Sequence, residues 1–210
     1  MSSAKVDMKI VLLGSSYTGK SCLVNRFINE TFEEKIQETV GAAFSAKTIE
    51  IGNDEQMILG VWDTAGQERF ESMSKMYYRK SNAAILCYDV TQKESFDKLK
   101  FWAKQLKENE PSCRIYITAT KIDLLDLGQK RAVALETIEE YAEIINARIF
   151  ETSAKQNLNV NELFLKIATD FKEEKNGNEI KNPEEINEKK GKKLKLNLND
   201  EEKRKTGCCK

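Results

Sequence analysis

The segment from Met8 to Asn29 constrains the fold more than any other part of the chain. An apolar, β-rich run, Met8–Leu13, leads into the loop GSSYTGKS at residues 14–21, and residues 19–29 then have the apolar spacing of a helix. The loop fits the pattern G-x-x-x-x-G-K-[ST], in which backbone N–H groups surround phosphate oxygens at a helix N-terminus. Lys20 would reach the outer phosphates, and the Ser21 hydroxyl would bind magnesium. The segment therefore predicts binding of a nucleoside triphosphate, without indicating its base.

Strand and helix patterns alternate through the rest of the chain as far as residue 171. The predicted strands after the first are residues 43–51, 56–62, 83–89, 114–120 and 148–151. The predicted helices after the first are residues 95–109, 133–145 and 160–171. The first two of these strands are joined at the turn sequence Gly52-Asn53-Asp54, so one edge strand should be antiparallel. We expect an α/β fold with a six-stranded, mostly parallel sheet, helices on both faces and ligands at the carboxyl ends of the strands.

Composition excludes several classes of protein. Lys plus Arg and Asp plus Glu both number 34, so the net charge is zero and no nucleic-acid partner is expected. The chain contains no His, which excludes His-dependent catalysis. Cys22, Cys87 and Cys113 occur singly, so they do not form a zinc site. The N-terminus lacks the apolar region of a signal peptide and the Gly of a myristoylation site, and no apolar run is long enough to span a bilayer. We therefore expect a cytosolic chain, unless lipid is attached to it.

The composition changes after about residue 172. Residues 173–210 are rich in Lys, Glu and Asn and contain no aromatic residue, so they cannot bury enough surface to offset the entropy of ordering. We expect a folded domain at residues 7–172 and a disordered tail at 173–210. From Lys189 onward the tail carries an excess of basic residues, which would attract it to anionic membrane surfaces. Asp200, Glu201 and Glu202 interrupt this stretch, and a merely solvated run of charge is the alternative.

Three further motifs resemble those of the small GTPases of the Ras superfamily. They are WDTAGQERF at residues 62–70, ETSAK at 151–155 and TKID at 120–123, each of which follows a predicted strand. The resemblance covers residues 7–171 almost continuously and implies the P-loop small GTPase fold. It implies that guanine nucleotide is bound by Ser16, Tyr17, Thr18, Gly19, Lys20, Ser21, Cys22, Phe32, Thr39, Gly66, Thr120, Lys121, Asp123, Ser153, Ala154 and Lys155.

The same resemblance assigns individual roles. Ser21, Thr39 and Asp63 would hold magnesium, Thr39 only in the GTP state. The Gly66 amide would bond the γ-phosphate, and Gln67 would be the catalytic residue that orients the attacking water. Phe32 would stack on the guanine, with a core residue after the first helix as the less favoured alternative. Asp123 would accept hydrogen bonds from the guanine ring, which adenine cannot provide.

Two residues depart from the family pattern. Thr120 stands where the family has Asn, and the lost hydrogen bonds should cost roughly 1–3 kcal/mol, which weakens nucleotide binding about 10- to 100-fold. Whether this changes base specificity or only affinity stays open. Tyr17 stands where the family usually has Gly, and its side chain could either stiffen the phosphate loop or crowd the γ-phosphate and slow hydrolysis.

Within the superfamily the chain resembles the Rab proteins, and among them the endosomal type and a divergent, autophagy-linked subgroup. The resemblance rests on GAAF at residues 41–44, MYYR at 76–79 and paired cysteines near the C-terminus. Phe44, Trp62 and Tyr77 match the aromatic triad with which Rab proteins contact effectors. Cys208 and Cys209 match the site of double geranylgeranylation, and two lipid chains anchor a protein stably. The trailing Lys210 is unusual and leaves open whether both cysteines are modified.

These features predict a monomeric, membrane-anchored switch that binds GTP or GDP with Mg²⁺, hydrolyses GTP slowly and regulates vesicle traffic. The family implies effectors of the GTP form, an exchange factor, a GTPase-activating protein, and prenyl-binding escort and dissociation-inhibitor proteins. It also implies the cytosolic face of an endosomal or related membrane, with cycling through the cytosol. One alternative is a switch held in one state with negligible hydrolysis. Another is a P-loop ATPase or nucleotide kinase, which Asp123 and residues 153–155 argue against.

Overall fold

The computed structural model describes residues 6–34, 37–52, 55–66 and 76–179, with side chains as far as residue 176. The chain divides into two compact units, residues 1–169 and 170–210. The first unit contains the entire sheet, and the boundary between the units falls within the last helix. Gln67, Cys208, Cys209 and the tail from residue 180 lie outside the described residues.

The sheet has six strands in the order β2-β3-β1-β4-β5-β6. The strands are β1 Met8–Leu13, β2 Ala42–Glu50, β3 Gln56–Thr64, β4 Ala83–Asp89, β5 Arg114–Thr120 and β6 Arg148–Glu151. Only the edge strand β2 is antiparallel to its neighbour, and the other four pairings are parallel. The predicted mostly parallel sheet with one antiparallel edge strand is confirmed.

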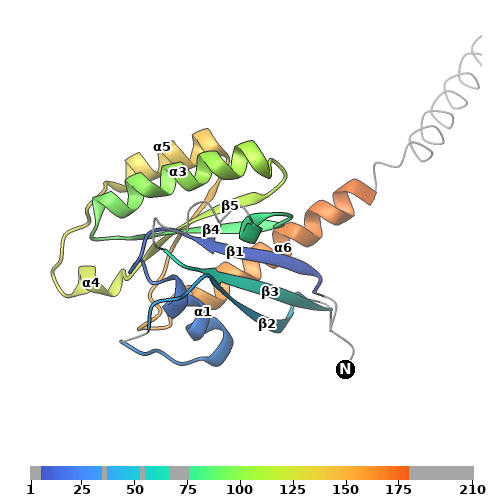
Figure 1. Ribbon diagram of the computed structural model, residues 1–210, viewed down its shortest axis with the longest axis horizontal. Helices are drawn as coiled ribbons and strands as arrows, with labels where there is room; N and C mark the ends of the chain where they lie inside the picture. The colour runs from blue at the N-terminus through green and yellow to red at the C-terminus, as the bar shows by residue number, and fades with distance from the viewer. Residues whose placement is uncertain (1–5, 35–36, 53–54, 67–75, 180–210) are drawn as a thin grey trace, which may run out of the picture. The chain divides into compact units, whose positions relative to one another are not determined.

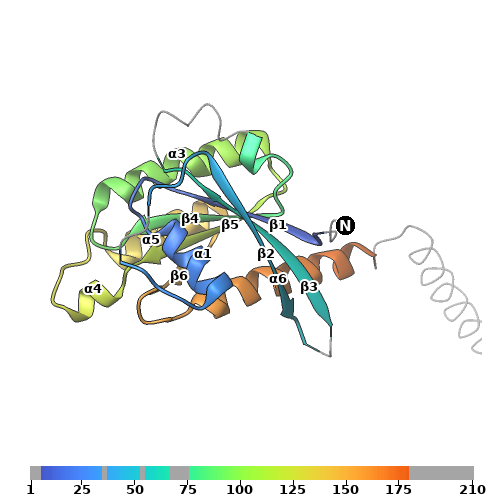
Figure 2. The same cartoon turned by 60° about the horizontal axis from the view of Figure 1, so that its bottom comes forward.

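Helices cover both faces of this sheet, as Figures 1 and 2 show. The helices are α1 Lys20–Asn29, α3 Lys93–Asn109, α4 Asp123–Asp126, α5 Leu135–Ile145 and α6 Val160–Glu179. Helices α3 and α5 lie on one face, and α1 lies on the other with the first part of α6 (Figure 1). On that second face the rings of Phe27 in α1 and Phe164 in α6 stack with centroids 3.7 Å apart.

The central strands are buried because their side chains are apolar on both faces, the pattern expected of a parallel sheet between helices. Every residue of β4 is buried, and five of the six residues of β1 are. Buried residues of β1, β4 and β5 pack with Leu99 and Trp102 of α3 and with Ile138 and Ala142 of α5 in one apolar cluster. This packing fixes the parallel strands in register, so their carboxyl ends open on the same edge of the sheet.

The helices differ from the sequence expectation mainly at their ends. Helix α3 begins at Lys93 rather than at residue 95, because its first residues are polar and add nothing to the apolar spacing. Helix α6 continues to Glu179 rather than ending at residue 171, through a polar stretch rich in the helix formers Lys and Glu. The short helix α4 was not predicted, since Asp123–Asp126 is too brief to show a helical period.

Candidate nucleotide-binding site

Two glycines allow the tight turns of the loop between β1 and α1. Gly14 has φ +144°, and a Cβ atom there would lie 2.3 Å from the main-chain oxygen of Cys87. Gly19 has φ +84°, the left-handed region that favours glycine. The Thr18 hydroxyl donates to the Ser15 carbonyl at 2.9 Å. The loop is therefore closed on itself immediately before the N-terminus of α1, as a phosphate-binding loop requires.

Lys20 folds back into this loop. Its Nζ atom donates to the carbonyl oxygens of Gly14 and Ser15, each at 2.9 Å, and the residue is only 5% exposed. Burial lowers the pKa of Lys20 below its ordinary value, and the nearby charge of Asp63 partly opposes this shift. In the part of the chain that the structure describes, this buried ammonium group bonds to carbonyl oxygens rather than to a carboxylate, so an anion beside the loop would stabilise it.

Three oxygen-bearing side chains meet beside the first turn of α1. Thr39 Oγ1 lies 2.9 Å from Ser21 Oγ and donates to Asp63 Oδ2 at 3.1 Å. The other carboxylate oxygen of Asp63, Oδ1, is buried and has no hydrogen-bond partner among the described residues. Burial raises the pKa of Asp63, while hydrogen bonds from Ser21 and Thr39 and the charge of Lys20 oppose the rise.

This group of three oxygens fits a hard divalent cation. Mg²⁺ is held in nucleotide sites by one or two carboxylates together with hydroxyls, waters and phosphate oxygens. A cation would neutralise the buried carboxylate of Asp63 and use its unpartnered Oδ1 atom. In the part of the chain that the structure describes, no group of three or more His, Cys, Asp or Glu side chains could hold a metal by itself. The set of Ser21, Thr39 and Asp63 thus suits a metal that shares its coordination with a ligand.

Gly66 packs directly against the phosphate loop. A Cβ atom on Gly66 would lie 2.4 Å from the backbone nitrogen of Ser16 and 2.6 Å from the carbonyl oxygen of Ser15. The preceding amide, that of Ala65, donates to the Gly41 carbonyl at 2.8 Å. Only glycine allows this approach, which brings the backbone of the segment after β3 to the phosphate end of the site.

Thr120, at the end of β5, bonds to protein atoms. Its hydroxyl lies 2.6 Å from the carbonyl oxygen of Thr18 and 2.8 Å from that of Tyr88. A hydroxyl has one proton, so it donates to one of these carbonyls at a time and has none left for a ligand. Thr120 therefore connects the phosphate loop with β4 and β5.

The residues that follow Thr120 form the opposite end of the site. Asp123 is buried, and its Oδ1 atom accepts from the Ser153 hydroxyl at 2.6 Å. Ser153 Oγ in turn accepts from the Gln156 amide at 3.0 Å. Ser153 thus orients the carboxylate of Asp123, leaving its other oxygen for a ligand.

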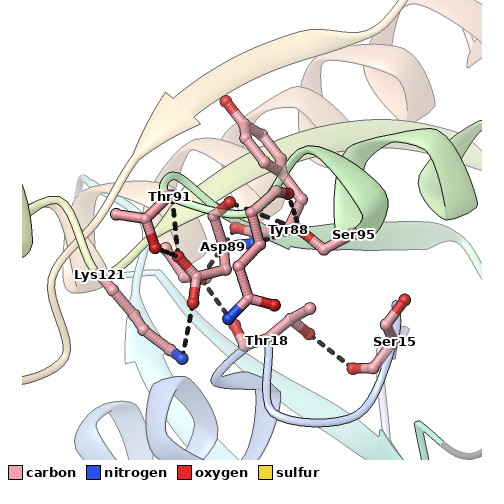
Figure 3. A network of polar contacts seen from close by, with 9 residues as sticks. Ser15, Thr18, Tyr88, Asp89, Thr91, Ser95 and Lys121 are labelled. Atoms are coloured by element: carbon pink, nitrogen blue, oxygen red, sulfur yellow. Dashed lines mark hydrogen bonds and ion pairs between the residues drawn. The ribbon is translucent and has the colours of Figure 1, made fainter. Parts of the chain in front are cut away.

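Sequence reasoning missed Asp89, which holds Lys121. Asp89 Oδ2 lies 2.8 Å from Lys121 Nζ, and its Oδ1 accepts from the amide and the hydroxyl of Thr91 (Figure 3). Burial raises the pKa of Asp89, but the hydrogen bonds from Lys121 and Thr91 outweigh it and hold the pKa below its ordinary value. The carboxylate is therefore charged at neutral pH. The available signal was its position at the carboxyl end of a buried parallel strand, because Asp63 lies near the same end of β3.

Arg26 of α1 is a second residue that the sequence did not single out. Its Nε donates to the Ala154 carbonyl at 2.7 Å, and one terminal nitrogen donates to the Lys155 carbonyl at 3.4 Å. Helix α1 thereby holds the backbone of the loop after β6. The apolar spacing of α1 carries no signal for this contact, which joins segments far apart in the sequence.

Most of the predicted ligand residues line one pocket of about 510 Å³, the size of a small-molecule site. Those at its wall are Ser16, Tyr17, Gly19, Lys20, Ser21, Cys22, Phe32, Thr39, Gly66, Thr120, Lys121, Asp123, Ala154 and Lys155. Thr18, Asp63 and Ser153 lie behind them and bond to wall residues or their neighbours. Tyr17 does not turn into the loop, because its side chain is 71% exposed and reaches Glu38.

The predicted effector residues lie outside this pocket. Phe44 and Trp62 face each other across β2 and β3, with ring centroids 4.6 Å apart, and Phe44 is exposed. Tyr77 lies by the start of β2, where its hydroxyl is 3.1 Å from the position of a Cβ on Gly41. The structure therefore pairs two of the three aromatic residues and places the third beside the same strand. Among the described residues, no helix combines the length and apolar character needed to cross a bilayer.

Comparison with known proteins identifies the family. A family model described as Ras family matches residues 9–173. The chain is 43% identical to Ras-related protein Rab-24 of Dictyostelium discoideum over 211 aligned positions, covering 100% of both chains. It is 46% identical over 159 residues to Ras-related protein Rab-31 of Rattus norvegicus, covering 75% of this chain and 80% of that protein. It is 45% identical over 164 residues to GTP-binding protein ypt5 of Schizosaccharomyces pombe, covering 78% of this chain and 77% of that protein.

The pocket, the motifs and these similarities agree. The chain belongs to the Ras family as a Rab-type small GTPase, a guanine-nucleotide-binding GTP hydrolase that serves as a switch in vesicle trafficking.

Proposed function

We propose that this chain is a magnesium-dependent switch anchored to the cytosolic face of an endosomal or related membrane, with slow intrinsic hydrolysis. The observation that carries the nucleotide part is a buried ammonium group at the phosphate loop beside a buried carboxylate whose Oδ1 atom has no hydrogen-bond partner among the described residues. Lys20 lies in the phosphate loop, and Asp63 lies with Ser21 and Thr39 beside it. A magnesium–phosphate group would complement both. When bound, Mg²⁺ would neutralise phosphate charge during hydrolysis.

The remaining roles follow from the arrangement of the pocket. Phosphate oxygens would be bound by Lys20 and by backbone amides of residues 16–22 and Gly66. The guanine base would lie between Phe32 and Lys121, with Asp123, Ala154 and Lys155 at its edge. Asp123 would accept from the guanine ring, and adenine offers no matching donors. Gln67 would orient the attacking water.

Guanine specificity is tested with fluorescent GDP on the full-length chain without lipid. We expect magnesium-dependent binding that unlabelled GTP displaces and ATP does not. Asp123→Ala should weaken binding, whereas Asp97→Ala, which removes an exposed carboxylate of α3, should leave it unchanged. Displacement by ATP at the same concentration as GTP would contradict the proposed base pocket.

Slow hydrolysis is tested by single-turnover release of phosphate with Mg²⁺. We expect a slow rate that Gln67→Ala lowers further, and acceleration of roughly 10³–10⁵ by a partner that supplies an arginine. The alternative of a switch held in one state predicts no phosphate release from the wild-type chain, even with such a partner.

Membrane anchoring rests on Cys208 and Cys209, with geranylgeranyl groups as the lipid. The folded domain would span residues 7–172, and residues 173–210 would act as the tether. Effectors, an exchange factor and a GTPase-activating protein are the general partners of such a switch. Prenyl-binding escort and dissociation-inhibitor proteins would deliver it to the membrane and return it to the cytosol. Replacing both cysteines with Ser should move the protein from the membrane fraction to the cytosol, and retention at the membrane would contradict the anchor.

A further inference from the structure

Tyr17 connects two segments that border the pocket. Its hydroxyl donates to Glu38 Oε1, and both residues line the pocket. Tyr17 has φ +62°, a left-handed conformation that is uncommon for a residue with a side chain. This backbone conformation directs the ring out of the phosphate loop and across to the segment before β2.

Glu38 immediately precedes Thr39. The Thr39 hydroxyl contacts Ser21 and Asp63, the other two side chains proposed to hold magnesium. The contact between Tyr17 and Glu38 therefore joins the residue before Thr39 to the loop that would bind the phosphates.

The same segment is also held near its other end. Lys155 Nζ lies 3.1 Å from Glu34 Oε1, and the backbone of Lys155 is in turn bound by Arg26. Glu34 and Glu38, which flank residues 35–36 outside the described part of the chain, thus each contact a loop of the pocket, and the Tyr17 contact is the one beside Thr39.

We propose that Tyr17 is a positioning residue, whose hydroxyl holds Glu38 and thereby keeps Thr39 against Ser21 and Asp63. The proposal rests on the function proposed above, because it assumes a magnesium-bound triphosphate at Thr39. It concerns the triphosphate form, since Thr39 contributes there to the metal and the γ-phosphate. Losing the hydroxyl should let the segment open and the triphosphate leave sooner.

The test measures release of a fluorescent, non-hydrolysable GTP analogue from the full-length chain. In Tyr17→Phe an exposed hydrogen bond to a carboxylate is lost, so we expect release with Mg²⁺ to accelerate about two- to fivefold. With EDTA, or with GDP, the difference from wild type should disappear. Tyr141→Phe is the matched control, because it removes the hydroxyl of a half-buried tyrosine of α5, far from the pocket lining.

A double-mutant cycle tests whether the two side chains act together. Glu38 also makes another contact, so Glu38→Ala should accelerate release at least as much as Tyr17→Phe, and the double variant should be no faster than Glu38→Ala alone. Multiplied effects in the double variant, or a Tyr17→Phe rate equal to that of Tyr141→Phe, would overturn the proposal.

A third variant separates the hydroxyl from the backbone. Tyr17→Gly suits φ +62° and lacks the phenol, so it should fold stably and release the triphosphate as fast as Tyr17→Phe. Release at the wild-type rate from Tyr17→Gly would also overturn the proposal. Failure of the wild-type chain to bind guanine nucleotide with Mg²⁺ would instead refute the proposed function itself.

Discussion

The hydroxyl of Thr120 lies 2.6 Å from the main-chain carbonyl oxygen of Thr18, which joins the end of β5 to the phosphate loop. Thr18 follows Tyr17 in that loop and precedes Gly19, where a Cβ atom would lie 3.7 Å from Thr120 Cβ. Thr120, one of the two positions at which the chain departs from its family, thus supports the phosphate loop.

Removing this hydroxyl should destabilise the protein. In Thr120→Val the buried Thr18 and Tyr88 carbonyls lose a donor, so we expect the free energy of unfolding to fall by about 0.5–1.5 kcal/mol and GDP affinity to fall severalfold. Urea unfolding and GDP titration measure the two effects. Thr118→Val is the control on the same strand, because the buried Thr118 hydroxyl has no partner among the described residues. Equal losses in both variants would refute the role of the Thr120 contact.

Gly66→Ala should disturb the phosphate loop. The new methyl group would meet backbone atoms of Ser15 and Ser16 rather than a flexible side chain, so one segment must shift, at a cost of roughly 1–3 kcal/mol. We expect affinity for a GTP analogue to fall about tenfold or more. Gly128→Ala, where no atom lies within 4 Å of the added Cβ but a φ of +83° strains the backbone, tests a glycine substitution away from the site. Its affinity should stay unchanged, and an unaffected Gly66→Ala would contradict the close packing.

Arg26→Ala should accelerate the release of guanine nucleotide. The side chain donates to the carbonyls of Ala154 and Lys155, so its loss frees the loop at the base end, and we expect GDP to dissociate about tenfold faster. Stopped-flow measurement of labelled GDP checks the rate. Arg79→Ala, which removes an exposed arginine, should leave the rate unchanged. If the two variants release GDP equally fast, Arg26 does not hold the loop.

The cysteines should differ in reactivity. Burial raises the pKa of Cys87 and of Cys113 to about 12 in each case, and the thiolate is the reactive form. At pH 8 the thiolate fraction is then about 10⁻⁴, so iodoacetamide should label these two residues far more slowly in the folded protein than after unfolding. Raising the pH from 8 to 9 should increase the labelling rate of both thiols in the folded protein about tenfold, because the thiolate fraction rises tenfold per pH unit below the pKa.

Peptide mapping by mass spectrometry resolves each cysteine. Cys22 lines the pocket, and burial raises its pKa as well. Bound GDP should therefore slow its labelling beyond the rate in the nucleotide-free chain. Labelling of Cys87 in the folded protein as fast as in urea would contradict its burial.

The strands were predictable because their signal is local. Met8–Leu13 is apolar apart from Lys9, and Ala83–Asp89 is a run without charge that ends on Asp89, so their observed limits equal the predicted ones. Helix ends were less predictable. Helix α5 begins at Leu135 rather than at residue 133, because a loop residue that packs on the core continues the apolar spacing of the helix. Val133 is such a residue.

The site was predictable as far as its motifs extend along the chain. Lys20 and Asp123 follow strands and Asp63 lies near the carboxyl end of β3, which runs to Thr64 rather than to residue 62, and the sheet brings these strand ends together. The partners Asp89, Arg26 and Glu38 were not predicted, because each acts on a residue of a different segment and no spacing records such a contact. The direction of the Tyr17 ring could not be predicted for the same reason, because it depends on the position of Glu38 in another segment.

Helix α1 begins with Lys20 and Ser21 at the phosphate end and carries Arg26 at the base end. At 1.5 Å of rise per residue, Ser21 and Arg26 are separated by about 7.5 Å along a rigid rod. Helix α1 therefore sets the spacing between the phosphate loop, which Lys20 bonds, and the loop after β6, which Arg26 bonds. Any partner that displaced α1 would break the contacts of Lys20 and of Arg26 together.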